Sequence, residues 1–184
     1  MANIYFSSDL HLCHNQPFLY EPRSFTKVED MNEAIVDNFN SVITADDDLY
    51  LLGDNMLNNN ETAMLYFNQL PGRIHLVWGN HDSETRQEIL SYAHNVVEIC
   101  GYATILKYHK YRFYLSHYPT ICSNFDEDKP LRMQTICLCG HSHVNDKFID
   151  MNKGIIYHVE LDAHNCYPVS IDQIIEDIKG YYYR

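Results

Sequence analysis

The sequence predicts an α/β protein in which mixed β-sheets are flanked by helices. Apolar runs of strand length alternate with segments of helical periodicity through the first half of the 184-residue chain. The second half contains a series of strand-like runs and ends in one amphipathic segment. A β-α-β-α-β-α pattern followed by a strand-rich half indicates mixed sheets with helices outside them. The length fits one domain that spans residues 1–184.

Three strands and three helices are expected in the first half. The strands are Asn3–Ser7, Leu49–Leu52 and Ile74–Trp78. Thr26 and Glu29 form a capping-box pattern ahead of the first helix, whose apolar residues recur at helical spacing. Asn60 is expected to cap a short second helix. Ser83 is expected to cap a third helix, which continues to about Tyr92.

The second half is expected to be mostly strands. These are Val96–Cys100, Ala103–Tyr108, Tyr111–Ser116, Thr135–Cys139 and Gly154–Val159. A charged loop is expected over Asn124–Pro130. Ser170 and Gln173 form a second capping-box pattern, and the isoleucines that follow them predict a closing amphipathic helix.

Composition limits the function classes. The chain has 13 Lys and Arg residues against 25 Asp and Glu residues, which gives a net charge of −12 with histidine neutral. Such a surface repels phosphate backbones, so extended binding to nucleic acid is not expected. The apolar runs are too short to span a membrane, and the N-terminus lacks a signal-peptide pattern. A cytoplasmic protein without membrane contact is therefore expected, with its six cysteines reduced.

Polar clusters of metal-ligand type follow five of the predicted strands. They are Asp9-Leu10-His11, Gly53-Asp54, Gly79-Asn80-His81-Asp82, Ser116-His117 and Gly140-His141-Ser142-His143. Ligands of open α/β sheets gather at the carboxyl ends of strands, so these clusters are expected to converge. The glycines fit this interpretation, because a chain that turns sharply to direct a side chain often needs a positive φ or a close backbone approach.

The convergent side chains predict a metal centre with two divalent ions. The candidate ligands are Asp9, His11, Asp54, Asn80, His117, His141 and His143. Seven ligands are too many for one tetrahedral zinc ion and suit two ions that share a bridging carboxylate. Oxygen and imidazole ligands without thiolates favour manganese, iron or zinc over calcium or magnesium. Unrelated polar loop residues are the alternative, but buried carboxylates and imidazoles without compensation are costly.

The ordered motifs D-x-H, G-D, G-N-H-D, H and G-H-x-H resemble the signature of the calcineurin-like metallophosphoesterases. They run from Asp9 to His143, about three-quarters of the chain, and the short chain is similar to the small bacterial and phage-type phosphodiesterase members. The resemblance implies a four-layer α/β/β/α sandwich of two mixed sheets. It also implies a hydrolase in which a hydroxide bridging two metal ions attacks phosphorus in line.

The resemblance assigns roles to individual positions. One ion would be held by Asp9, His11, Asp54 and His143, and the other by Asp54, Asn80, His117 and His141. Asp54 would bridge them. His81 would be the catalytic residue that stabilises charge or protonates the leaving oxygen. In the protein serine/threonine phosphatases of this superfamily the G-D motif extends to G-D-x-x-D-R-G, which is absent after Asp54. This departure counts against protein phosphatase activity and leaves the group that orients His81 open.

The expected substrate is a small phosphodiester or a nucleotide. The alternatives are a phosphomonoesterase or nuclease of the same superfamily, or a non-catalytic protein-interaction scaffold on the same fold. A scaffold whose metal site had decayed would have lost some of the ligand positions, and all are present here.

Three residues are candidates for substrate contact. His14 and Asn15 follow the first motif, with a surface-loop role as the alternative. Arg23 offers a bidentate fork for a phosphate oxygen, with a solvated loop arginine as the alternative. Asp162, His164 and Asn165 precede the last helix and are interpreted as ordinary turn chemistry, with a place at the rim of the site as the alternative.

Overall fold

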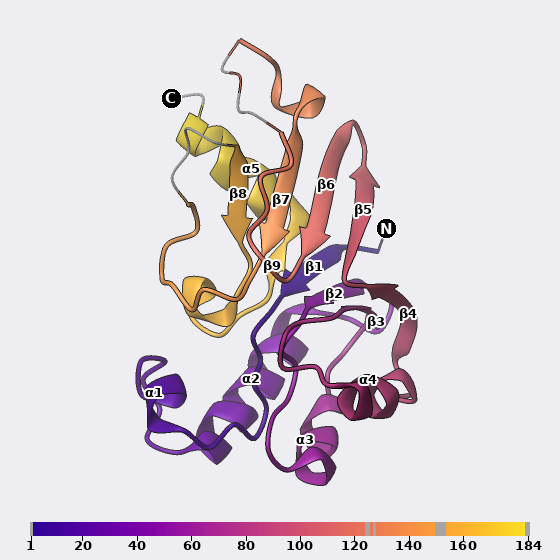
Figure 1. The fold of residues 1–184 in the computed structure, drawn as a ribbon, viewed down its shortest axis with the longest axis vertical. Helices are drawn as coiled ribbons and strands as arrows, with labels where there is room; N and C mark the ends of the chain where they lie inside the picture. Colours follow the sequence, from indigo (N-terminus) through magenta and orange to yellow (C-terminus); the bar gives the residue numbers. More distant parts are fainter. Residues whose placement is uncertain (1, 124–125, 127, 150–153, 183–184) are drawn as a thin grey trace.

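The computed structural model describes residues 2–123, 126, 128–149 and 154–182, and it contains two mixed β-sheets (Figure 1). The first sheet has the strand order β4 (Val96–Gly101), β3 (Arg73–Val77), β2 (Asp48–Leu52), β1 (Ile4–Ser7) and β9 (Val169–Ser170). Strands β1 to β4 pair in parallel, and β9 pairs antiparallel to β1.

The second sheet has four strands. Their order is β5 (Ala103–Tyr108), β6 (Tyr111–Ser116), β7 (Thr135–Cys139) and β8 (Ile155–His158). Strands β5 and β6 form an antiparallel hairpin, whereas β6, β7 and β8 are parallel. The expected architecture of two mixed sheets with flanking helices is therefore confirmed. The expected charged loop 124–130 lies partly outside the described residues.

Five α-helices accompany the sheets in the described part of the chain. They are α1 (Pro17–Tyr20), α2 (Val28–Val42), α3 (Asn60–Phe67), α4 (Glu84–Ser91) and α5 (Ile171–Tyr182). Short 3-10 helices cover Leu131–Met133 and Leu161–His164. Figure 1 shows α2, α3 and α4 on the side of the first sheet that faces away from the second sheet.

Two predicted helix caps are wrong, one is right in position only, and one is confirmed. Helix α2 starts after Lys27 without a side-chain cap, so the expected capping box does not form. The cap of α3 is Asn59, whose side chain accepts the N–H of Thr62, one residue before the expected position. Ser83 precedes α4 but makes no side-chain cap bond. The Ser170 hydroxyl accepts the N–H of Gln173, as expected for α5.

Alternating side chains of the first sheet build two separate cores. Leu49 and Leu51 of β2 pack with α2 and α3, while Tyr50 and Leu52 face the second sheet. Helix α5 joins this second core through four isoleucines, Ile171, Ile174, Ile175 and Ile178. Burying a large apolar side chain stabilises a fold by about 1.5–3 kcal/mol, so these faces fix the register of the strands. The carboxyl ends of β1, β2, β3, β6 and β7 consequently lie near one another.

No helix in the described ranges is long and apolar enough to cross a membrane. All six cysteines are free thiols, as predicted.

Candidate metal centre

The loops that follow the strands hold several predicted ligands in left-handed backbone conformations. Asp9 has φ 57°, Asp54 has φ 55° and His141 has φ 76°, and His11 and His143 both have φ 49°. Such conformations are strained for residues with a Cβ atom, and strain of this kind clusters at functional sites. The geometry agrees with the inference that these turns direct side chains to a common point.

Close backbone packing at these turns requires glycine. A Cβ atom on Gly79 would collide with the Asp54 carboxylate, and one on Gly140 would collide with the carboxylate of Asp9. The motif glycines therefore let neighbouring loops approach closely enough for their side chains to meet.

Two buried carboxylates, to which the sequence analysis assigns no role of this kind, hold the loops in place. Asp82 accepts the backbone N–H groups of Asp54 and Gly79 at 2.9 Å each, and that of Asn55 at 3.2 Å. Glu160 accepts those of Ser142 and Val144 at 3.1 and 2.6 Å. Each carboxylate satisfies loop N–H groups that have no partner in a sheet, which is a requirement for buried backbone.

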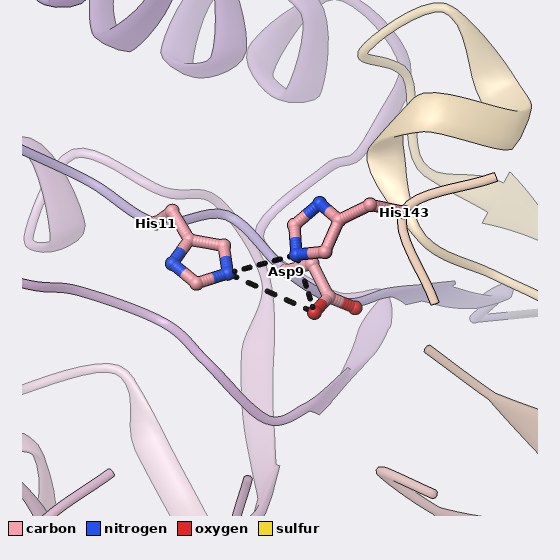
Figure 2. Close-up of side chains that lie close together, drawn as sticks. All are labelled: Asp9, His11 and His143. Carbon is pink, nitrogen blue, oxygen red and sulfur yellow. Dashed lines mark hydrogen bonds and ion pairs between the residues drawn. The ribbon is translucent and has the colours of Figure 1, made fainter. Parts of the chain in front are cut away.

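The first cluster consists of Asp9, His11 and His143 (Figure 2). The Nε2 atoms of the two histidines are 3.2 Å apart and lie 3.8 and 3.5 Å from Asp9 Oδ1. Asp9 is fully buried, and its Oδ1 atom has no hydrogen-bond partner. A buried carboxylate oxygen normally has a partner, so this orphaned atom beside two imidazole nitrogens fits a bound cation.

The second cluster consists of Asn80, His117 and His141. Asn80 Oδ1 lies 2.9 Å from His117 Nε2 and 3.0 Å from His141 Nδ1, and these two nitrogens are 3.2 Å apart. His117 Nδ1 lies 2.9 Å from the carbonyl oxygen of Leu52 and donates its proton to it. This bond fixes the tautomer, so the lone pair of His117 Nε2 faces the cluster.

Asp54 lies between the two clusters. Its Oδ2 atom is 3.7 Å from His11 Nε2 and 3.4 Å from His117 Nε2. Its other oxygen accepts the backbone N–H of His81 at 2.8 Å. The structure thus brings all seven predicted ligands together and puts one carboxylate within reach of both groups of histidines.

Asp162 binds the Nδ1 side of His143, a member of the first cluster. Its carboxylate lies 3.1 Å from His143 Nδ1 and forms a bidentate pair with Arg23 at 2.6 and 3.0 Å. Burial raises the pKa of Asp162, but the hydrogen bonds from His143 and Arg23 outweigh it and hold that pKa well below its usual range. The ionised carboxylate fixes the proton of His143 on Nδ1, which leaves Nε2 free to bind a cation.

The interpretation of Asp162 as ordinary turn chemistry is therefore incomplete. Its partners are distant in sequence, since Arg23 is 139 residues away and His143 is 19 residues away. No local pattern connects these positions.

Two of the three substrate candidates do not face the cluster. The side chain of Arg23 is 1% exposed, and it binds Asp162 and the carbonyl oxygen of Asp9 instead of facing solvent. Its predicted role as a phosphate-binding fork is wrong, because a buried carboxylate occupies the fork. Asn15 lines a different hollow, beside Cys13. His14 does lie at the site, with its Nδ1 atom 3.3 Å from His11 Nδ1.

His81 projects into the cavity rather than into either cluster. Its side chain is 45% exposed, and its Nε2 atom is 4.0 Å from Asp54 Oδ2. The neighbouring Asp82 points away and binds the backbone, so it does not orient the imidazole ring. The ring centroid of His81 lies 5.4 Å from that of His11.

In the protein without metal ions, burial and neighbouring charges shift the pKa values of the candidate ligands away from their ordinary values. Burial raises the pKa of Asp9 to about 6 and lowers that of His11 well below its usual range. Burial also disfavours a charge on His117, but the hydrogen bond to Asp54 and the charge of Asp9 outweigh it and raise the pKa to about 9. Divalent cations displace such protons and stabilise ionised carboxylates, so this donor set fits metal ions.

The site opens into a cavity of about 470 Å³. Its polar residues are His11, His14, Asp54, Asn80, His81, His141, His143 and Asp162. Phe18, Leu19 and Pro22 form an apolar wall on the remaining side. No lysine or arginine is among these lining residues of the described chain.

Comparison with known proteins decides the family. The model of the calcineurin-like phosphoesterase family matches residues 2–181. The chain belongs to this family. The resemblance drawn from the sequence motifs is thereby confirmed, and metal-dependent phosphoester chemistry is the general property of the family.

Two relatives and one solved structure are similar to this chain. It is 30% identical to the uncharacterized protein MJ1445 of Methanocaldococcus jannaschii, over 97% of this chain and 93% of the relative. It is 26% identical to the Gene 66 protein of Mycobacterium phage L5, over 78% of each. The crystal structure of AQ665 from Aquifex aeolicus, titled a protein of unknown function, matches with a TM-score of 0.68. That match has 24% identity and covers 97% of this chain and 100% of AQ665, so it supports the fold.

Proposed function

We propose that this calcineurin-like phosphoesterase is a dinuclear metal-dependent phosphodiesterase. The observation that carries the proposal is the position of Asp54, whose carboxylate lies between two groups of histidines. One ion would be held by Asp9, His11, Asp54 and His143, and the other by Asp54, Asn80, His117 and His141. Two divalent ions at such a site activate a water molecule and neutralise the charge of the phosphate group.

The donor set favours manganese, iron or zinc as the metal. Imidazole nitrogens supply four of the seven proposed ligands, and the described thiols lie outside both clusters. Imidazole suits these transition metals, whereas magnesium and calcium prefer oxygen ligands alone.

The chain's own residues would perform the remaining steps. Asp162 and Leu52 fix the ring protons of His143 and His117, so that the opposite nitrogens keep their lone pairs toward the centre. His81 projects from the cavity wall and is the proposed catalytic residue. Its imidazole would donate a hydrogen bond to the phosphate group or a proton to the leaving oxygen.

The cavity favours a diester over a monoester. A diester carries one negative charge and a second organic group, whereas a monoester carries up to two charges. The lining residues include no lysine or arginine to pair with the extra charge. Nearby, Arg23 is bound to Asp162, and Arg86 donates to the backbone oxygen of His81. The apolar wall of Phe18, Leu19 and Pro22 offers a surface for the second ester group. The proposed partner is therefore a small phosphodiester or nucleotide.

The test compares bis(p-nitrophenyl) phosphate with p-nitrophenyl phosphate. The protein is stripped with a chelator and reloaded separately with manganese, zinc or magnesium. We expect metal-restored hydrolysis that is faster for the diester. A preference for the monoester would indicate a phosphomonoesterase, and two bound ions without turnover of either ester would contradict the proposal.

A further inference from the structure

The cavity beside the metal ligands is lined in part by an exposed aromatic ring. Phe18 is 70% exposed, although it lies beside Leu19 and Pro22 in the same cavity. Single exposed apolar residues are ordinary on protein surfaces. An apolar wall inside a cavity that also contains candidate catalytic groups is instead typical of a ligand site.

The backbone that carries Phe18 is anchored by its neighbours. Its neighbour Leu19 is 4% exposed and packs into the core with α2, which anchors the short helix α1. The backbone N–H of Leu19 donates to Gln16 at 2.9 Å, and that of Glu21 donates to Pro17 at 2.9 Å. The buried side chain of Leu19 fixes helix α1. A ligand that binds beside Phe18 therefore does not have to order this part of the backbone, and the binding step loses little conformational entropy there.

Two ring contacts, one edge to face and one tilted, connect Phe18 to the metal ligand His11. Its centroid lies 5.8 Å from that of His14, and the two ring planes are perpendicular at 87°. The centroid of His14 lies 5.2 Å from that of His11. A phosphate group at the metal centre would therefore place one of its ester groups near Phe18 and His14.

We propose that Phe18 binds a flat aromatic ester group of the substrate, such as the base of a nucleotide diester. This inference rests on the proposed phosphodiesterase function and specifies its substrate class. An aromatic ring stacks on Phe18 and meets His14 edge to face, which are the geometries that aromatic pairs prefer. The lack of cationic side chains in the cavity fits such a group. A neutral ester group needs no cation, and the described lining residues include no lysine or arginine.

The experiment compares two diesters that differ only in the flatness of one ring. Phenyl methyl phosphate and cyclohexyl methyl phosphate have equal charge and six ring carbons each. Their binding to the manganese-loaded protein is measured by calorimetry and as competitive inhibition of bis(p-nitrophenyl) phosphate hydrolysis. We expect the phenyl ester to bind roughly three- to tenfold more tightly, in keeping with the strength of aromatic pairs.

Variants assign this preference to one residue. Phe18→Ala should abolish the phenyl preference, and Phe18→Leu should abolish it while keeping an apolar wall. Phe18→Trp should keep it. The control is Tyr92→Ala, which removes another exposed aromatic ring, 82% exposed and outside the cavity, and should also keep the preference.

Two results would overturn the inference. One is equal binding of both diesters to the wild-type protein. The other is a phenyl preference that persists in Phe18→Ala and Phe18→Leu. Calorimetry does not depend on whether bis(p-nitrophenyl) phosphate is hydrolysed, so failure of the inference in calorimetry is distinguishable from failure of the proposed phosphodiesterase.

Discussion

At the scale of single residues, His81 differs from the other histidines of the site. It is half-exposed and outside both ligand clusters, so we expect His81→Ala to retain both metal ions. Loss of a general acid typically lowers turnover by 100-fold or more. Elemental analysis and steady-state hydrolysis of bis(p-nitrophenyl) phosphate test this expectation. Loss of metal from the variant would show that His81 is a ligand instead.

Asp162 is expected to act through His143. Removing a carboxylate that orients a ligating histidine costs about 10- to 100-fold in metal affinity, so Asp162→Asn should weaken one of two metal-binding steps by that factor. Asp48→Asn is a matched control, because Asp48 also binds an arginine and a histidine, Arg73 and His75, away from the site. Manganese titrations of both variants provide the comparison. Equal isotherms for the two variants would contradict this role.

Individual motif residues were predictable, whereas their supporting partners were not. The seven proposed ligands follow strands and occur in short motifs, so their convergence could be inferred from strand direction. Asp162, Glu160 and Asp82 act through the folded chain, and their partners are backbone groups or distant side chains. Arg23 illustrates the same limit, since its sequence context does not reveal that a buried carboxylate binds it.

At the scale of secondary structure, α5 is joined to β8 through one carboxylate. Asp177 accepts hydrogen bonds from Tyr157 at 2.6 Å, Lys147 at 2.8 Å and Gln173 at 2.7 Å. Tyr157 is fully buried, so Asp177→Ala would leave its hydroxyl group without this partner. We expect a loss of about 1–3 kcal/mol in the free energy of unfolding at pH 7, measured in urea.

The contribution of Asp177 depends on pH. Burial raises the pKa of Asp177, but hydrogen bonds from Lys147, Tyr157 and Gln173 outweigh it and lower that pKa below its usual value. A lowered pKa in the folded state gives stability above the unfolded value of about 3.9, and this stability is lost as the pH falls through the folded pKa. The stability difference between wild type and Asp177→Asn should therefore shrink between pH 5 and pH 2. A constant difference over that range would contradict the assigned cause.

Long elements were easier to predict than short ones. The principal strands and α2 follow from apolar periodicity, because one face of each is buried over several residues. Helix α1 has four residues and β9 has two, which is too short for periodicity to identify. The expected capping box at Thr26 does not form, because α2 begins only after Lys27, and Ser83 stands at the start of α4 without a side-chain cap bond.

At the scale of the whole molecule, the site joins loops from both sheets. Asp9 and Asp54 follow strands of the first sheet, while His117 and His141 follow strands of the second. Metal ions bound here would connect the two sheets and stabilise the folded state by mass action. A free metal concentration 100-fold above the dissociation constant gives about 2.7 kcal/mol for one site.

Chelation should consequently lower the urea midpoint of the wild-type protein, and manganese should restore it. Asp54→Asn should show a much smaller response to either treatment, because this residue is the proposed ligand of both ions. A metal response that is equal in the variant and the wild type would place the stabilising ions elsewhere.

Titration of manganese into chelator-stripped protein tests the dinuclear centre most directly. Bound metal and hydrolysis of bis(p-nitrophenyl) phosphate are followed in the same samples, with Asp54→Asn in parallel. We predict two ions per chain, hydrolysis that rises with the second ion, and weakened binding of both ions in the variant. Saturation at one ion per chain, or full hydrolysis after the first ion, would contradict the shared position of Asp54 between two metal ions.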